Sequence, residues 1–381
     1  MNHRERVMAA LDHRETDRVP VDLGSTIVTT ATRIAYQGLL GYLGLPADDS
    51  PAISHRQMDT VYPREDLLER YDIDCRAVYL KGPWEFQTKE LPGNRFTDEY
   101  GLLWEKASFY YDVVGRPFAG MEAPSDLASA QWPDPYDPGR VAGIREEARR
   151  LHEETDYLVV ADIMCLGPFE GACFLRGYED FSTDLYWNPK LAHAILDKVT
   201  ETDIALWDLF IDHVGPYVQV VAQGDDLGTQ RGPWTSPDMY RKMIKPYHQR
   251  LYDFIHSRTS AKVFMHSCGS VFDLIPDLIE VGVDVLNPIQ RSAAKMDIAT
   301  MKQQFGTELC FWGGGIDVQQ VLPFATHEEI EREVRYSIET LGRDGGYVFC
   351  PAHNIQPDVS PDRIDVMYRA ALGHRLASQF P

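Results

Sequence analysis

Short apolar runs alternate with longer segments of helical periodicity along most of the chain. The runs are rich in Val, Ile, Leu, Phe and Tyr and lack a clean alternation with polar residues, which is typical of parallel strands covered on both faces. This pattern predicts strands at 19–23, 74–79, 157–162, 217–222, 262–266, 283–287, 309–312 and 347–350. It predicts helices between them, including 236–258, 271–281, 294–305, 327–341 and 361–376.

The order of these elements predicts the fold class. A β-α unit repeated about eight times indicates an α/β protein with a (β/α)8 (TIM) barrel, formed by residues 1–381 as one domain. Ser236-Pro237 and Ser360-Pro361 support two of the helices, because each places a capping hydroxyl before a first-turn proline. A doubly wound open sheet is the main alternative, since spacing does not reveal strand order.

One stretch, residues 82–138, interrupts this rhythm and is rich in Pro, Gly, Trp and Tyr. Residues 95–104 within it resemble a hairpin with a turn near Glu99-Tyr100-Gly101. We therefore expect an inserted lobe between strands two and three of the barrel, over one of its ends. Its aromatic side chains could wall a pocket for an aromatic substrate or simply pack the lobe onto the barrel: Trp84, Phe86, Tyr100, Trp104, Phe109, Tyr110 and Tyr111.

Composition and charge narrow the class of protein. The 381 residues include 58 acidic and 37 basic side chains, a formal charge of −21. This balance argues against a general nucleic-acid binder or a binder of anionic membranes. The chain shows no run of about 20 apolar residues, and its first residues predict a charged amphipathic helix rather than a signal peptide. Six cysteines are too few for a disulfide scaffold, so we expect a soluble cytoplasmic protein with reduced thiols.

The C-terminal ends of the predicted strands carry residues that can bind a metal. His266 and Cys268 end strand five as an H-x-C pair, and Cys350 ends strand eight. Because barrel enzymes place their chemistry at this rim, the three could meet there. One imidazole and two thiolates would suit Zn²⁺ with an open fourth position. Spacing alone gives about even weight to buried core cysteines and a hydrogen-bonded histidine, and His353 is a competing ligand.

Carboxylates follow strands three and four. Asp225 and Asp226 could bind substrate, act as acid or base, or orient His266, and Glu170 could reach the same mouth. The alternatives are that the aspartates cap a helix and screen Arg231, and that Glu170 is solvated.

Three residues after strands six and seven are candidate cofactor-binding residues. These are Asn287, Gly314 and Gly315. No phosphate-binding motif surrounds the glycines, so a tight β-α turn is the better explanation of them. The remaining cysteines have no partner at metal-ligand spacing and are predicted to pack in the interior: Cys75, Cys165, Cys173 and Cys310.

Several segments together resemble one protein family over nearly the whole chain. They are R-E-R-V-M-A-A-L at 4–11, D-R-V-P-V at 17–21, G-P-F-E at 167–170, L-R-G at 175–177, D-D-L-G at 225–228, H-S-C-G at 266–269, L-N-P at 286–288 and G-G-I-D at 314–317. The chain resembles the uroporphyrinogen decarboxylase superfamily, and in particular its methyltransferase branch. That branch includes methylcorrinoid:coenzyme M methyltransferases and methyltransferases of anaerobic O-demethylation.

The resemblance implies a barrel, a homodimer and a zinc site. In the zinc-dependent members an H-x-C pair and a distant cysteine hold the metal, and these positions match His266, Cys268 and Cys350. The run from Cys350 to Gln356 departs from the coenzyme M branch and is more similar to O-demethylase relatives, which leaves open whether Cys350 or His353 is the third ligand. True decarboxylases carry a motif like R-Q-A-G-R near the first strand; here Gly24-Ser25-Thr26 follows it, which argues against decarboxylation.

The function implied by this resemblance is transfer of a methyl group from a methoxylated, aromatic substrate to cob(I)alamin. No D-x-H-x-x-G corrinoid-binding motif occurs in the chain, so a separate corrinoid protein would bring the cofactor. The alternatives are methyl transfer from a methylcorrinoid to a thiol, a metal-free lyase that depends on Asp225 and Asp226, and a non-catalytic subunit of a methyl-transfer complex.

Overall fold

A computed structural model describes residues 1–164 and 167–373. Seven parallel strands form one curved sheet in the order β14-β13-β12-β11-β10-β9-β4. Read from β4 to β14, the strands lie side by side in the same order as in the sequence. The bounds are β4 Cys75–Val78, β9 Leu158–Ala161, β10 Val220–Gly224, β11 Lys262–His266, β12 Val285–Asn287, β13 Cys310–Trp312 and β14 Tyr347–Val348.

The predicted first strand closes the sheet into a barrel, although it forms only one isolated β-bridge. Val21 pairs in parallel with Phe349, just past β14. The amide of Asp22 donates to the carbonyl of Phe349 at 2.9 Å, and the amide of Asp74 donates to the carbonyl of Val21 at 3.0 Å. Val21 therefore lies between β14 and β4, which confirms the (β/α)8 barrel and excludes the open sheet.

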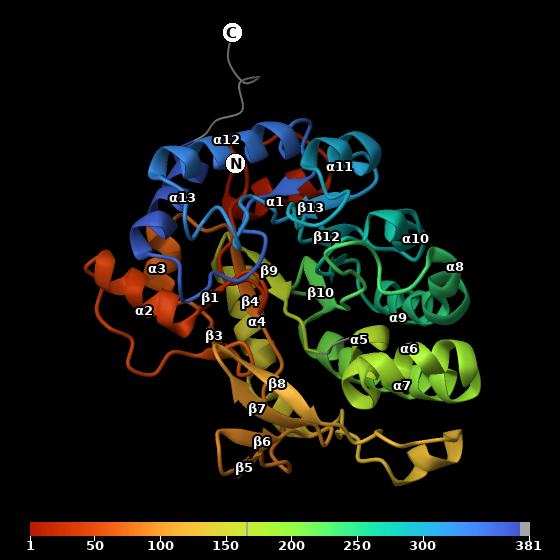
Figure 1. Ribbon diagram of the computed structural model, residues 1–381. Coiled ribbons are helices and arrows are strands. Elements are labelled where there is room, and N and C mark those ends of the chain that lie inside the picture. The colour runs from red at the N-terminus through yellow and green to blue at the C-terminus, as the bar shows by residue number, and fades with distance from the viewer. Residues whose placement is uncertain (165–166, 374–381) are drawn as a thin grey trace.

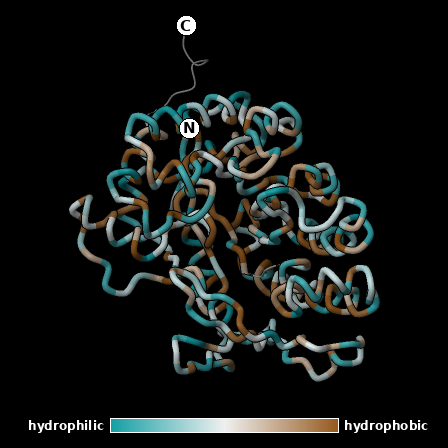
Figure 2. Tube along the Cα trace, viewed as in Figure 1, coloured by the Kyte–Doolittle hydropathy of each residue, from teal (hydrophilic) through white to brown (hydrophobic). Residues whose placement is uncertain are grey.

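Alternation along the strands separates the barrel interior from the layer beneath the helices. Phe264 and Val285 point inward into one apolar cluster, whereas Val263 and Leu286 belong to the larger cluster between strands and helices. The interior cluster also contains Cys310, Trp312, Val348 and Cys350. The apolar stretches of the tube in Figure 2 accordingly follow the strands. Because side chains alternate with a period of two, the residue after an inward one faces the helices.

Helices surround the barrel, as Figure 1 shows. Helix α12 coincides with its predicted range, whereas the predicted 236–258 helix is interrupted by a π-helical turn at Tyr240–Ile244. The predicted 361–376 helix is described as far as Gly373. The bounds are α1 His3–Leu11, α2 Arg33–Tyr42, α3 Glu65–Arg70, α4 Ile144–Glu154, α5 Pro168–Arg176, α6 Tyr178–Trp187, α7 Pro189–Val214, α8 Pro237–Met239, α9 Lys245–Arg258, α10 Ile275–Glu280, α11 Ile298–Phe305, α12 His327–Leu341 and α13 Pro361–Gly373, with short 3-10 turns at Pro124–Ser129, Pro138–Val141 and Phe272–Leu274.

An antiparallel lobe lies between β4 and β9, the second and third barrel strands, as predicted. Its strands are β5 Lys89–Leu91, β6 Arg95–Thr97, β7 Leu103–Ala107 and β8 Tyr110–Gly115. The predicted hairpin joins β6 to β7, and its turn ends at Gly101 with a φ of +82°, a conformation that favours glycine. A second small sheet has the strand order β1-β3-β2, with bounds β1 Ala31–Thr32, β3 Thr60–Val61 and β2 Ile53–His55. The amide of Tyr111 donates to the carbonyl of Gln57, linking the lobe to the turn after β2.

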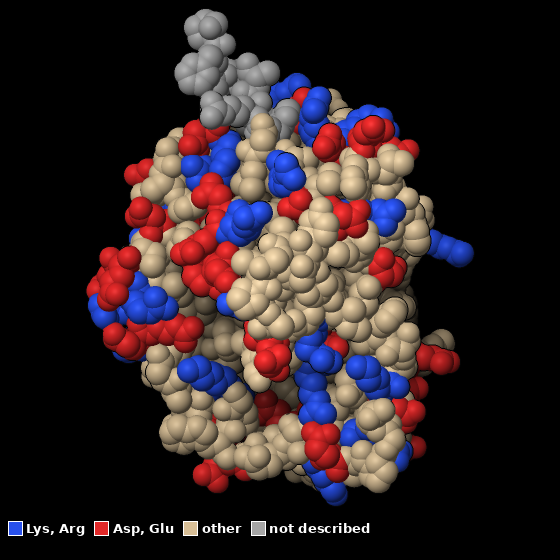
Figure 3. Space-filling view, turned by 90° about the vertical axis from the view of Figure 1, so that its left-hand side faces the viewer, with Lys and Arg blue, Asp and Glu red and all other residues tan. Residues whose placement is uncertain are grey.

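On the face shown in Figure 3, acidic and basic side chains are interspersed around an area without charged groups. Within residues 1–164 and 167–373, every helix is too short or too polar to cross a lipid bilayer.

Candidate metal centre and the two cavities beside it

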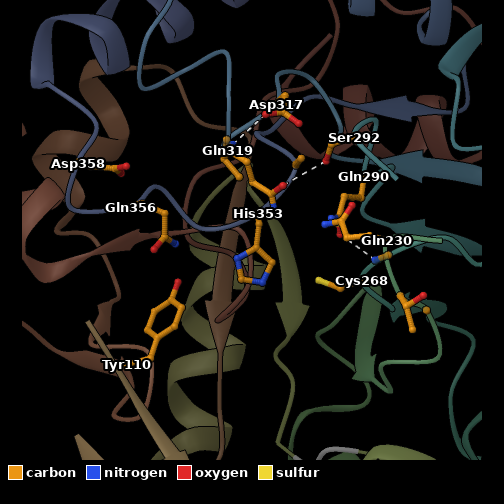
Figure 4. Close-up of a pocket in the computed structure, with 15 residues that line it drawn as sticks. Tyr110, Gln230, Cys268, Gln290, Ser292, Asp317, Gln319, His353, Gln356 and Asp358 are labelled. Carbon is orange, nitrogen blue, oxygen red and sulfur yellow. Dashed lines mark hydrogen bonds between the residues drawn. The ribbon is translucent and has the colours of Figure 1, made fainter. Parts of the chain in front are cut away.

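His266, Cys268 and His353 form one group at the C-terminal mouth of the barrel. Their potential ligand atoms all lie within 4.8 Å of one another. The Sγ of Cys268 is 3.3 Å from Nε2 of His266, and the rings of His266 and His353 have centroids 5.5 Å apart. Figure 4 shows the side chains of Cys268 and His353 pointing toward one another across the cavity. The three residues come from β11, the turn after it and the loop after β14.

Strand alternation and one amide explain the position of His266. His266 follows the inward-facing Phe264 by two residues and therefore also faces inward, at the last position of β11. Asn287 at the end of β12 donates from Nδ2 to the carbonyl of Trp312 at 2.7 Å, so its Oδ1 accepts from Nδ1 of His266, 2.5 Å away. The lone pair of Nε2 is thereby left facing Cys268.

The group does not include Cys350, which the sequence predicts as a metal ligand beside His266 and Cys268. Cys350 follows the inward-facing Val348 by two residues and is fully buried in the apolar interior of the barrel. Burial raises the pKa of its thiol well above the usual value. The loop after β14 returns to the rim three residues later, and this brings His353, the alternative predicted ligand, into the group.

Electrostatics keep the three groups uncharged in the absence of a cation. Burial lowers the pKa of His266 to about 4, and burial together with the neighbouring His266 lowers the pKa of His353 to about 4. Burial, followed by Asp226 and Glu170, raises the pKa of the Cys268 thiol well above its usual value. At neutral pH both imidazoles retain a lone pair, whereas the thiol retains its proton.

Asp225 is fully buried and lines neither of the two cavities described below. Its carboxylate accepts hydrogen bonds from the amides of Phe169 and Glu170, at 3.0 and 2.6 Å, in the first turn of α5. It also accepts from Nε2 of His248 at 2.7 Å, and the other ring nitrogen of His248 is 2.9 Å from the hydroxyl of Tyr240. Asp225 therefore fixes α5 against the end of β10.

The Asp225 network includes two residues that the sequence did not single out, Tyr240 and His248. The contact between Asp225 and His248 joins residues 23 positions apart and has no motif. Gly167 is the sequence signal nearest to it, because a side chain there would collide with the carbonyl of Gly224. The loop before α5 can thus approach β10 closely only with glycine at this position.

Asp226 and Glu170 face the candidate metal centre. The amide of Cys268 donates to Oδ1 of Asp226 at 2.7 Å, and that oxygen is 3.8 Å from Nε2 of His266. The amide of Asp226 donates to Oε2 of Glu170 at 3.3 Å. Burial raises the pKa of both carboxyls, and Asp226 is the second cause for Glu170.

The other candidate residues occupy packing positions. Gly314 has a φ of +73°, and a Cβ there would lie 2.8 Å from the carbonyl oxygen of Ile289. A Cβ on Gly315 would overlap the ring of Phe349. Both glycines line neither cavity, and Asn287 orients His266 instead of facing one. Cys75, Cys173 and Cys310 are buried, and Cys165 lies outside the described residues.

A cavity of about 540 Å³ lies beneath the lobe. Asp226, His266 and His353 line one part of it, and residues of the lobe and of the loop after β9 line the rest. Of the predicted aromatic wall, Tyr100, Trp104, Tyr110 and Tyr111 line this cavity. In contrast, Trp84 and Phe109 are exposed and line neither cavity.

A second cavity of about 580 Å³ also reaches the group. Cys268 and His353 line it, together with the amide side chains of Gln230, Gln290, Gln319 and Gln356. Figure 4 shows these side chains around the rim, with Tyr110 approaching from the lobe. The two cavities share Tyr110 and His353. The candidate metal centre thus lies at their junction.

The donor set is chemically suited to zinc. Two unprotonated imidazoles and one thiol that a cation would deprotonate are ligands of a borderline-soft metal and are poor ligands for Mg²⁺ or Ca²⁺. The hydrogen bond from His266 to Asn287 is the kind of outer contact that fixes a metal-binding tautomer. Three protein ligands leave one position open, which is the arrangement of catalytic sites.

Comparisons with known proteins agree with the barrel. The family model described as Uroporphyrinogen decarboxylase (URO-D) matches residues 116–374. A uroporphyrinogen decarboxylase of Citrifermentans bemidjiense is 26% identical over 55% of this chain, and a methylated-thiol–coenzyme M methyltransferase of Methanosarcina mazei is 23% identical over 60% of it. This chain spans 58% of the length of each relative. A solved methyltransferase from Methanosarcina mazei has the same fold, with a TM-score of 0.65, 19% identity and coverage of 97% of this chain and 98% of that one.

Proposed function

This chain belongs to the uroporphyrinogen decarboxylase (URO-D) family, and we propose that it is a zinc-dependent methyltransferase within that family. It takes a methyl group from a methoxylated aromatic compound and passes it to the cob(I)alamin of a separate corrinoid protein. The methyltransferase names of two relatives support the reaction type, and the aromatic cavity supports the donor.

The observation that carries this proposal is the position of His266, Cys268 and His353 at the junction of two cavities. The cavity beneath the lobe is large enough for a methoxylated ring and has aromatic walls. The second cavity opens beside the same ligands and is lined by amide groups. A methyl donor and a methyl acceptor can therefore approach one point from separate cavities. This arrangement favours group transfer between two bound molecules over a reaction of one.

The acceptor is supplied by a partner in this proposal. The chain has no D-x-H-x-x-G motif, so the corrinoid belongs to another protein. The carboxamide groups at the edge of a corrin ring match hydrogen-bonding side chains such as Gln230, Gln290 and Gln319 in the second cavity. We assign this cavity to the acceptor and the cavity beneath the lobe to the donor.

The residues of the chain have distinct tasks in the reaction. When bound by His266, Cys268 and His353, zinc would polarise the ether oxygen as a Lewis acid and make the phenolate a better leaving group. Asn287 keeps the Nε2 lone pair of His266 directed at the centre. Glu170 lines the donor cavity and, because burial raises its pKa, retains a proton that it can deliver to the departing oxygen. Asp225 positions Glu170 through the first turn of α5.

Metal analysis combined with single-turnover methyl transfer tests this function. Purified protein should retain about one zinc per chain and methylate free cob(I)alamin from an aryl methyl ether, a reaction that changes the visible absorbance of the corrinoid. Cys268→Ser should lose both the metal and the transfer. Full transfer by a protein without metal would overturn the proposal.

A second candidate is methyl transfer to a thiol, which the name of the Methanosarcina relative favours. The same donor set could lower the pKa of a bound thiol and present a thiolate. Incubation with methylcobalamin and a small thiol distinguishes the two, because only this candidate consumes methylcobalamin without an aryl ether. A metal-free lyase would depend on Asp226 and be unaffected by Cys268→Ser.

A further inference from the structure

The donor cavity beneath the lobe has an unusual charge composition. Six of the residues that line it carry a carboxyl group, and among the described residues no lysine or arginine lines it. The acidic residues come from the lobe, the start of α5, α7 and the end of β10: Asp98, Glu99, Asp112, Glu170, Asp203 and Asp226. An anionic ligand would therefore lie among acidic side chains and lack a compensating positive side chain on the lining.

Two arginines near this wall make ion pairs with other residues, and Lys106, whose Nζ lies 5.4 Å from the ring centroid of Tyr111, does not line the cavity. Arg140 makes an ion pair with Glu99 and is almost fully buried. Arg56 forms two hydrogen bonds with Glu90, at 2.7 and 2.9 Å, and its guanidinium stacks on the ring of Phe96. Neither arginine lines the cavity. Reaching a ligand would cost each of them an ion pair within the lobe.

The rest of the wall is aromatic or uncharged. Trp104 and Phe174 pack with ring centroids 5.6 Å apart, and Tyr110 and Tyr111 line the cavity from β8. His55 lines it from β2, and its Nδ1 is buried without a hydrogen-bond partner among the described residues. Burial lowers the pKa of His55 to about 4, so the ring is neutral at physiological pH. It can therefore exchange a hydrogen bond with a hydroxyl or amide but offers no charge.

From this lining we propose that the methyl donor is an aryl methyl ether without any acidic substituent. The inference rests on the proposed function, because it assumes a methoxylated aromatic donor. It adds that compounds with a carboxylate, sulfonate or phosphate group are not donors. The aromatic walls bind the ring by apolar and stacking contacts, and His55 accepts or donates a hydrogen bond at an uncharged polar substituent. A carboxylate in the same place would be desolvated beside several carboxyl groups without a partner.

A matched pair of ligands tests the charge rule directly. 4-Methoxybenzamide and 4-methoxybenzoate have almost the same shape and differ by one negative charge. Binding of each to the zinc-containing protein is measured by isothermal titration calorimetry at pH 7.5 and low ionic strength. We expect the amide to bind at least about 10-fold more tightly, which corresponds to about 1.4 kcal/mol. Equal or tighter binding of the benzoate would overturn the inference.

A charge-reversal variant tests whether the lining causes this preference. Asp112 is exposed at the edge of the cavity, so Asp112→Lys adds a positive charge to the lining with little risk to folding. The amide-to-benzoate affinity ratio should fall at least about threefold. Glu85→Lys makes the same charge change at an exposed position of the lobe that does not line the cavity, and it should leave the ratio unchanged. An identical ratio in wild type and Asp112→Lys would contradict the electrostatic cause.

The experiment separates failure of the inference from failure of the proposed function. Tight binding of the benzoate together with methyl transfer from it overturns only the charge rule. Failure of both ligands to bind, with metal retained, overturns the aryl ether donor of the proposed function and the inference with it. Preferential binding of the amide without methyl transfer supports the charge rule for the cavity and rejects the transferase.

Discussion

Asn287 fixes the tautomer of His266. Its Nδ2 donates to the carbonyl of Trp312 at 2.7 Å, so its Oδ1 must accept the proton of His266 Nδ1, 2.5 Å away. The imidazole is thus held with Nε2 unprotonated and 3.3 Å from Sγ of Cys268. The amide at the end of β12 prepares the histidine at the end of β11 for a cation.

Replacing this amide should weaken metal binding. Asn287→Leu removes the acceptor and frees His266 to rotate or change tautomer, and we expect a 10- to 100-fold loss of zinc affinity. Asn287→Asp keeps an acceptor at the same place and should retain most of the affinity. Competition with a chromogenic chelator measures both variants. Wild-type affinity in Asn287→Leu would show that the hydrogen bond is not needed.

Substitutions of His353 and Cys350 can identify the third metal ligand beside His266 and Cys268. His353→Ala should abolish stoichiometric zinc binding, because His353 is the residue whose ligand atom lies within reach of His266 and Cys268. Cys350→Ser should leave the zinc content unchanged, since this thiol is buried in the barrel interior. Elemental analysis of the purified variants decides between them, and the reverse result would restore the cysteine ligand.

The Asp225 network should be a large contributor to stability. Asp225→Asn places an amide group where two backbone amides and His248 now donate, so buried donors lose their acceptor. We expect the free energy of unfolding to fall by about 3 kcal/mol. Asp226→Asn is the matched control, because the neighbouring side chain is only partly buried and should cost below about 1 kcal/mol. Urea denaturation followed by circular dichroism compares the two.

Asp162 should give the protein a specific pH dependence. Burial raises the pKa of this carboxyl to about 7, against about 3.9 in an unfolded chain. Between these values the native state binds more protons than the unfolded state, so this carboxyl stabilises the fold below about pH 4 and its contribution is lost as the pH rises through 7. The full difference is up to about 4 kcal/mol.

Asp162→Asn isolates this contribution. Subtracting the variant's unfolding free energy from that of wild type at each pH removes the other carboxyls from the comparison. The difference should decline from pH 4 to pH 8. A difference that stays constant over this range would mean that Asp162 is ionised in the native state throughout.

The sequence predicted the barrel because each strand carries its own signal. The run 262–266 is apolar on both faces and coincides with β11, since a covered parallel strand needs apolar side chains on both sides. The first strand was harder to delimit, because Val21 makes only a single bridge, to Phe349. The π-helical turn at Tyr240–Ile244 could not be predicted within the 236–258 helix, because the turn contains no proline or glycine to mark it.

The candidate site was predicted less completely, for a geometric reason. His266 and Cys268 are close in sequence, so their proximity follows from strand geometry alone. The choice between Cys350 and His353 depends on where β14 ends and the next loop begins, and spacing does not reveal that point. The contact between Asp225 and His248 is a tertiary contact without a motif, so sequence reasoning could nominate Asp225 but not the histidine that engages it.

The shared edge of the two cavities at Tyr110 and His353 has a kinetic consequence. In the proposed reaction the donor and the acceptor occupy separate cavities, so both can be bound before the methyl group moves, and either product can leave while the other stays. Initial rates measured against both reactants should therefore give intersecting double-reciprocal lines, the pattern of a ternary complex. Release of the first product before the second reactant binds would instead give parallel lines.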